Sequence, residues 1–126
     1  MIGHGIPSPD IRLEPWHIFH IDLGVIWQGY SSDIKRCWFV GDSVPDDVIR
    51  ALDAVNGAIS AGALALKPGV QGWEVDHAAR SFLVSQGYPE YMHALGHHVG
   101  RLAHDGGSLL GPKWERYGKT PTIPIE

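Results

Sequence analysis

The stretch HIDLGVIWQGYSSDIKR, residues 20–36, holds two runs of apolar and β-branched residues separated by a glycine-containing turn. With its flanking residues, this pattern predicts a β-hairpin whose arms are residues 16–25 and 32–40. Each arm carries one aspartate, Asp22 on the first and Asp33 on the second. Side chains on paired antiparallel strands can share one sheet face. We therefore expect the two carboxylates to point toward a common cavity.

Two facing carboxylates repel each other, so this arrangement is costly unless a proton or a cation lies between them. The competing interpretation is that each aspartate is an exposed turn residue, which is the commoner situation for this residue type. Asp22, however, follows Ile18, Phe19 and Ile21, and a carboxylate in such an apolar segment needs a partner. The pair indicates a metal site or a shared proton.

Beyond the hairpin, two amphipathic helices are expected. The first starts near Asp46 and ends at Lys67-Pro68-Gly69. Its apolar positions recur every three or four residues, with alanines between them: Val48, Leu52, Val55, Ile59 and Leu66. The second helix falls within residues 72–87, with a predicted buried face of Val75, Ala79, Phe82 and Leu83. An antiparallel helix pair that follows a strand pair and precedes a loop region predicts an α+β fold.

Length and composition bound the class of protein. A chain of 126 residues with 44% hydrophobic content suits one domain, residues 1–126. A formal net charge of -4 without a basic run makes nucleic acid a poor partner. No uninterrupted apolar stretch reaches the roughly 18–20 residues that span a bilayer, and the first ten residues lack a signal-peptide pattern. We expect a cytoplasmic protein without membrane contact, in which Cys37 is a small buried strand residue and not a reactive thiol.

Four histidines lie close together in HALGHHVGRLAHD, residues 93–105: His93, His97, His98 and His104. The neighbouring glycines would let the backbone approach a ligand, and neutral imidazole is a ligand for first-row metals. Cysteine pairs and an HExxH helix, the common zinc patterns, are absent from the sequence. The cluster favours a metal or proton-transfer role for at least one of these histidines.

A further histidine, His4, precedes a proline-rich turn in HGIPSPD, residues 4–10. It could face a pocket. Taken alone, it is better interpreted as an exposed loop histidine.

In this order and at these distances, the three features resemble the peptidase family of methionine aminopeptidase, Xaa-Pro aminopeptidase, prolidase and creatinase, over nearly the whole chain. In that family a DxG segment and an SD or TDxxR segment supply two metal-binding aspartates, which fall here on Asp22 in IDLG and Asp33 in SSDIKR. A glycine-flanked histidine supplies the third ligand, His97 in GHHVG. The resemblance implies part of a pita-bread fold, a curved antiparallel sheet with a helix pair.

The Xaa-Pro branch of that family has further histidines four residues before and seven residues after the ligand, matched by His93 and His104. The resemblance implies that both are catalytic and bond the substrate carbonyl and the developing tetrahedral anion. His4 matches a histidine that lines the substrate pocket.

The implied cofactor is a pair of divalent ions, with Mn²⁺, Co²⁺ and Zn²⁺ all suited to carboxylate and imidazole ligands. Two ions about 3.5–4 Å apart lower the pKa of a bridging water, and the resulting hydroxide attacks the scissile carbonyl. The implied activity is hydrolysis of N-terminal, Xaa-Pro peptide bonds in small peptides, and a homodimer is one option for the full-length protein.

The family site also uses two later glutamates, which we expect outside this chain. Residues 1–126 are therefore expected to be an incomplete catalytic domain, inactive by itself, with Glu126 as the alternative candidate for one glutamate. Two other functions stay open: a metal-free pita-bread protein that binds a peptide or protein, and a methionine aminopeptidase. A binding module has no need for two mutually repelling carboxylates, so Asp22 and Asp33 argue against the first.

Overall fold

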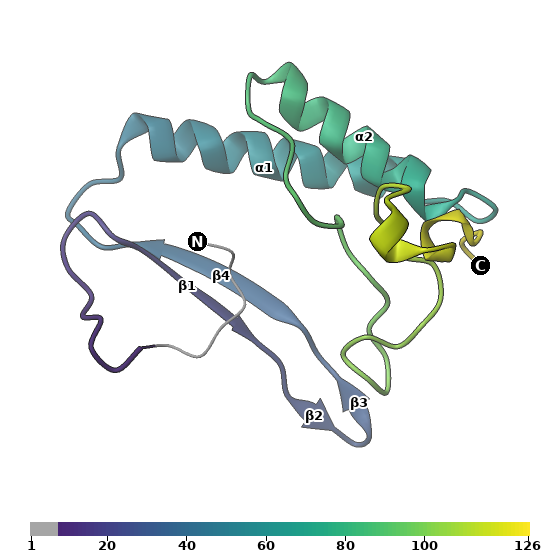
Figure 1. Cartoon of the computed structure of the whole chain (residues 1–126). Helices are drawn as coiled ribbons and strands as arrows, with labels where there is room; N and C mark the ends of the chain where they lie inside the picture. The colour runs from purple at the N-terminus through teal and green to yellow at the C-terminus, as the bar shows by residue number, and fades with distance from the viewer. Residues whose placement is uncertain (1–7) are drawn as a thin grey trace.

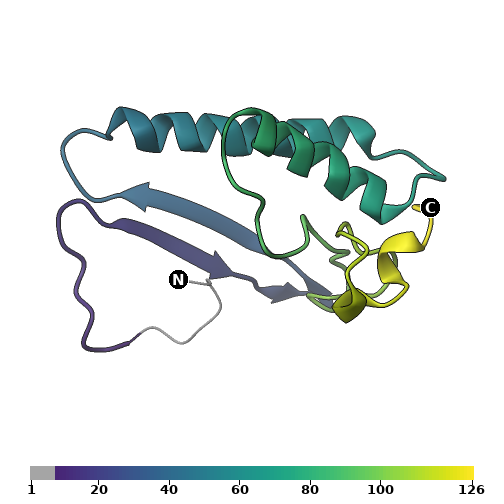
Figure 2. The ribbon, with the colours of Figure 1, turned by 45° about the horizontal axis from the view of Figure 1, so that its top comes forward.

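The computed structural model describes residues 8–126, and these form a β-hairpin, a helix pair and an irregular C-terminal segment (Figure 1). The elements are β1 (Ile18–Leu23), β2 (Ile26–Trp27), β3 (Tyr30–Ser31), β4 (Ile34–Phe39), α1 (Asp46–Ala65), α2 (Gly72–Ser85) and the 3-10 turns η1 (Glu115–Tyr117) and η2 (Thr120–Thr122). Both helices lie on one side of the hairpin, as Figure 2 shows from a second direction. The predicted α+β fold and both helices are confirmed.

The hairpin is one antiparallel ribbon with a break near its middle. β1 pairs with β4 so that Asp22 lies opposite Lys35 and Leu23 opposite Ile34. The ribbon continues as β2 and β3 and turns at Gln28 and Gly29, whose φ angles are 49° and 82°. Positive φ at both central residues matches the twist of the strands, so the turn is tight.

Gly24 lies at the break, where a backbone carbonyl of the opposite arm comes close to it. A Cβ atom at this position would lie 2.1 Å from the carbonyl oxygen of Ser32. The Ser32 backbone N–H donates to the Val25 carbonyl (2.9 Å), and the Ser32 hydroxyl accepts from the Val25 N–H (3.1 Å). Glycine is required because a backbone carbonyl fills the space of a side chain, and this keeps the two aspartate-bearing arms in register.

The two helices pack through small residues. The buried residues of α1 are Ala54, Ala58 and Gly62. On α2, Val75 and Ala79 are buried as predicted, while Phe82 and Leu83 are partly buried. Short side chains at the contact let the helix axes approach closely.

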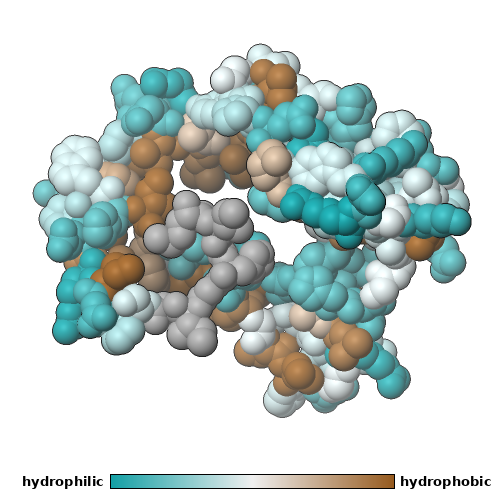
Figure 3. Space-filling view, viewed as in Figure 1, coloured by the Kyte–Doolittle hydropathy of each residue, from teal (hydrophilic) through white to brown (hydrophobic). Residues whose placement is uncertain are grey.

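The buried residues of α1 are its small ones, and not the larger apolar residues that form its sequence period. Leu52, Val55 and Ile59 are 55%, 45% and 55% exposed. The reason is that α1 turns its alanine and glycine face toward α2, which leaves its larger apolar side chains on other faces. Figure 3 shows apolar surface bordering the hollow between the helix pair and the hairpin.

α1 is the one helix within residues 8–126 that is long and apolar enough to cross a membrane by length and composition. A core helix of a soluble protein can meet the same criteria. Only 17% of its apolar window is buried, at the small residues that face α2.

Cys37 is exposed, which corrects the expectation of a buried strand residue. It lies on β4 opposite His20 of β1. Among the described residues, β1 and β4 form a two-stranded sheet, and so narrow a sheet does not surround the thiol on either side.

The Gly24 contact makes a stability prediction. Substituting Gly24→Ala should lower the free energy of unfolding by about 1–3 kcal/mol, because the Ser32 carbonyl must move to admit the methyl group. Urea denaturation followed by circular dichroism measures the loss. Val25→Ala, at a neighbouring residue that is 62% exposed, is the matched control and should lose clearly less. An unchanged midpoint for Gly24→Ala would contradict the close approach.

Candidate metal centre

The hairpin places both predicted aspartates on one face. Because side chains alternate along strands, Asp22 and its cross-strand partner Lys35 share a face, and Asp33, two residues before Lys35, lies on it as well. The Ser32 to Val25 hydrogen bond continues the ladder beyond Ile34 and so supports this placement of Asp33. One Asp22 oxygen, Oδ2, lies 3.2 Å from the Lys35 ammonium Nζ. The strand register thus puts the two aspartates on one face of the ribbon, and the convergence of their carboxylates on a common cavity stays a prediction.

His97 approaches this face from the loop after α2. Its Nε2 atom lies 3.3 Å from Oδ2 of Asp33. Its other ring nitrogen, Nδ1, lies 3.1 Å from the backbone carbonyl of His98. A carbonyl can only accept a hydrogen bond, so we assign the ring proton to Nδ1.

That assignment leaves the Nε2 lone pair of a neutral His97 facing a carboxylate oxygen of Asp33. Two acceptors at this separation repel unless a cation lies with them, either a proton on Nε2 or a metal ion between the two groups. Metal-binding histidines generally donate their second ring N–H to a carbonyl or carboxylate, as His97 does. Its orientation therefore fits a metal ligand.

The donor set, one imidazole nitrogen with carboxylate oxygens, suits first-row divalent ions. Asp33 and His97 are in contact, whereas Asp22 is paired with Lys35. Within residues 8–126, no group of three His, Cys, Asp or Glu side chains converges closely enough to hold an ion. The described residues thus assemble part of the predicted ligand set, and the ligand role of each stays a prediction.

His104 stacks beside His97. The two ring centroids are 4.1 Å apart, with an angle of 34° between the ring planes. Both rings line a cavity of about 260 Å³ together with Asp105, Gly106, Gly107, Leu109 and Thr120. The structure therefore brings His104 next to the candidate ligand, where it can reach a molecule bound in this cavity.

For the two other predicted histidines, His93 and His4, the structure gives less information about a catalytic role. His93 is exposed, and its Nδ1 lies 2.7 Å from the carbonyl of Ala94 while its ring stacks at 5.0 Å on Tyr91. His4 lies outside the described residues. The catalytic roles of both remain predictions.

Glu126 follows a segment that is bound to the connection between the helices. The backbone of Ile125 donates to the Val70 carbonyl (2.8 Å) and accepts from the Gly69 N–H (2.8 Å). Figures 1 and 2 both place this end of the chain beside the α1–α2 connection, away from β1 and β4.

A buried ion pair on α2 supports the histidine loop, and the sequence reasoning missed it. Asp76 and Arg80 are 1% and 6% exposed. The Arg80 guanidinium donates to both oxygens of the Asp76 carboxylate, from Nε (2.8 Å) and from Nη2 (3.0 Å). The sequence did hold a signal for this pair. In DHAAR, an aspartate and an arginine stand four residues apart, on the same helix face as Val75 and Ala79.

Both members of the pair also form hydrogen bonds with the backbone of the loop after α2. Oδ1 of Asp76 also accepts from the Leu95 N–H (3.1 Å) and from the Tyr91 hydroxyl (3.2 Å). The Arg80 guanidinium donates in addition to the carbonyls of Tyr91 and His93. The chain just before His97 is therefore held by α2 at several backbone groups.

This environment shifts the ionisation of Tyr91. Burial, and then the negative charge of Asp76, raise the pKa of the Tyr91 hydroxyl well above its ordinary value. The hydroxyl consequently stays protonated and remains a donor to Asp76.

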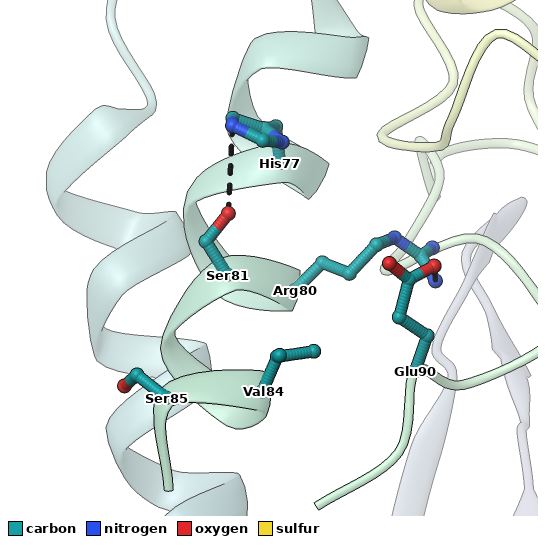
Figure 4. A pocket seen from close by; sticks show the side chains of 6 residues that line it. All are labelled: His77, Arg80, Ser81, Val84, Ser85 and Glu90. Atoms are coloured by element: carbon teal, nitrogen blue, oxygen red, sulfur yellow. Dashed lines mark hydrogen bonds and ion pairs between the residues drawn. The ribbon is translucent and has the colours of Figure 1, made fainter. Parts of the chain in front are cut away.

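A second cavity, of about 290 Å³, lies along the outer side of α2 and is lined by His77, Arg80, Ser81, Val84, Ser85 and Glu90 (Figure 4). His77 Nε2 and the Ser81 hydroxyl are 3.4 Å apart, one helical turn from each other. Both residues are exposed, and Figure 4 shows the Arg80 side chain extending away from them toward Glu90. We assign no chemistry to this pair.

Comparison with known proteins agrees with these features. A sequence profile of "Metallopeptidase family M24" matches residues 1–124. An Xaa-Pro dipeptidase of Pyrococcus horikoshii is 35% identical over 121 residues, covering 94% of this chain and 32% of the relative. A methionine aminopeptidase of Rickettsia prowazekii is 30% identical over 122 residues, covering 97% of this chain and 44% of the relative.

Solved structures show the same likeness. The prolidase from Pyrococcus furiosus superposes with a TM-score of 0.82 at 32% identity, covering 99% of this chain and 35% of that one. The X-Pro aminopeptidase from Thermotoga maritima also gives 0.82, at 29% identity, covering 98% of this chain and 33% of that one. The fold is that of the pita-bread enzymes, and the chain belongs to metallopeptidase family M24. It spans about a third of the length of the dipeptidase relatives that it matches.

The ion pair leads to a second stability prediction. Asp76→Asn should cost about 3–5 kcal/mol in the free energy of unfolding, because it removes the buried carboxylate and leaves the Arg80 charge with only the more distant and exposed Glu90, 3.7 Å away. Asp53→Asn, on the exposed surface of α1, is the matched control and should change the urea midpoint little. Equal midpoints for the two variants would show that the pair contributes nothing to the fold.

The Tyr91 shift predicts a pH dependence. The folded protein keeps the Tyr91 proton at a pH where the unfolded chain loses it, so this stabilisation is complete below pH about 10 and declines as the pH rises further. Urea unfolding between about pH 8 and 11 should show a steeper loss of stability for the wild type than for Tyr91→Phe. Parallel curves would contradict the assignment.

Proposed function

We propose that this chain is part of the catalytic domain of a metal-dependent Xaa-Pro dipeptidase or aminopeptidase, in which Asp22, Asp33 and His97 are metal ligands. The observation that carries the proposal is the Nε2 atom of His97, aimed at Asp33 with its Nδ1 bonded to a backbone carbonyl. Relatives named Xaa-Pro dipeptidase, at 35% identity over most of this chain, support the substrate class.

The chain's own residues divide the work as follows. Asp33 and His97 bind the metal, and the His98 carbonyl holds the His97 ring in the orientation of a ligand. His104 lies in the adjoining cavity, where a ring N–H can donate to the carbonyl oxygen of a bound peptide and stabilise the negative charge that develops on it. His93 is assigned, with His104, to the substrate carbonyl and the developing anion, and His4 to holding the peptide end. When bound, divalent ions supply an activated water for attack on the peptide carbonyl.

Mn²⁺, Co²⁺ and Zn²⁺ are the candidate ions, because all three accept imidazole and carboxylate ligands. We further propose a cytoplasmic location, with which a free Cys37 agrees, since such compartments keep thiols reduced. A homodimer of the full-length protein remains part of the proposal.

Methionine aminopeptidase activity is the second candidate. The methionine aminopeptidase of Rickettsia prowazekii is nearly as similar to this chain as the dipeptidases are. The two activities share the metal chemistry and differ in specificity: an Xaa-Pro peptidase requires proline after the cleaved bond, whereas a methionine aminopeptidase requires methionine before it.

The test uses the full-length protein loaded with Mn²⁺ or Co²⁺ and compares an Xaa-Pro dipeptide with a peptide that begins Met-Ala. We expect cleavage of the first. His104→Ala should lower kcat by about 10²–10³-fold, the usual cost of losing a donor to the developing anion, while metal content stays the same. His97→Ala should lose metal as well as activity.

His77→Ala, at an exposed histidine on α2, is the matched control and should keep both. Turnover of the Met-Ala peptide alone would favour the second candidate. If His104→Ala lost metal in proportion to activity, His104 would be a ligand and its assigned role would be wrong.

A further inference from the structure

Lys35 places a permanent positive charge on the face that carries the two candidate carboxylates. It lies directly opposite Asp22 in the β1–β4 register, with Nζ 3.2 Å from Oδ2 of Asp22. Asp33 is two residues earlier on the same strand and on the same face. A cation therefore already lies beside Asp22.

The surroundings of this ion pair differ for its two members. The Asp22 side chain is 23% exposed, whereas the Lys35 side chain is 58% exposed. Partial burial of the Asp22 side chain weakens solvent screening of this ion pair, so the ammonium offsets part of the negative charge on this face. The long, flexible lysine stem is free to swing its charge into solvent.

A divalent ion at Asp22 must compete with this ammonium. It meets a carboxylate oxygen that is already paired, and a like charge a few ångströms away. An ion that binds through Oδ2 of Asp22 would have to displace Lys35.

We propose that Lys35 is an internal competitor for the metal at Asp22: it neutralises Asp22 in the metal-free protein and lowers the affinity of this side of the centre for a divalent ion. The proposal rests on the proposed function, since it assumes that Asp22 is a ligand. Lys35 is a residue that sets metal occupancy, and it acts through Asp22.

The test is isothermal titration of the full-length, chelator-stripped protein with MnCl₂, which measures binding and not activity. Lys35→Met keeps an unbranched stem of similar bulk and removes the charge, so the weakest binding step should tighten by about three- to thirtyfold. Lys35→Arg keeps the charge and should stay within about twofold of the wild type. Circular dichroism of each variant checks that the fold is retained.

A double-mutant cycle locates the effect. In an Asp22→Asn background the gain from Lys35→Met should vanish, because the competitor then has no carboxylate to occupy. An equal gain with and without Asp22 would overturn the proposal, as would equal tightening by Lys35→Arg and Lys35→Met.

The outcomes also separate this inference from the proposed function. If the wild type binds Mn²⁺ and folded Lys35→Met binds it no more tightly, the inference fails and the metal centre stands. If neither protein binds Mn²⁺, the inference and the proposed metal centre are both wrong.

Discussion

The buried Asp76–Arg80 ion pair is the interaction on which the histidine loop depends. Removing two charges from water is costly, and a buried pair is tolerated only when hydrogen bonds satisfy its remaining atoms. Here the Asp76 carboxylate accepts four hydrogen bonds, two from Arg80 and one each from Tyr91 and Leu95. Because Tyr91 and Leu95 belong to the loop, the bonds that satisfy the Asp76 charge also fix the shape of the loop.

The C-terminal segment strengthens this arrangement from the other side. The Arg116 guanidinium donates to the Met92 carbonyl and lies over the ring of Trp114 at 4.4 Å. Arg80 in turn lies over the Tyr91 ring at 4.0 Å and the Trp114 ring at 5.2 Å. Alternating guanidinium groups and aromatic rings thus join α2, the loop and η1 in one stack.

The hairpin holds the opposite end of the same loop. The Ser31 N–H donates to the Gly100 carbonyl (2.7 Å), and the Ser31 hydroxyl donates to the Arg101 carbonyl (3.2 Å). His97 lies between this anchor and the one on α2, so its distance from Asp33 is set by contacts at both ends of the loop. The glycine break at Gly24, which keeps the hairpin arms in register, belongs to the same positioning system.

The sequence predicted the hairpin, both helices and the shared face of Asp22 and Asp33, because each follows from a local period or a short loop. It did not identify the buried face of α1, since alanine and glycine at Ala54, Ala58 and Gly62 carry little hydrophobic signal although they form the contact. It also missed the buried Asp76–Arg80 pair, because two charged residues on a helix are usually solvated. The Asp22–Lys35 contact depends on cross-strand register, which a one-residue slip would abolish.

The bond from His97 to the residue after it has an evolutionary consequence, because the acceptor is main chain and not side chain. Every amino acid offers a carbonyl, so position 98 can diversify while the imidazole beside it keeps its tautomer and aim. Space at Gly107 sets the limit, since a methyl group there would come within 2.9 Å of the His98 ring. Gly107 itself has a φ of 71°, which disfavours any side chain there, so a new residue at position 98 has to fit beside glycine, while the bond that orients the neighbouring imidazole is unaffected.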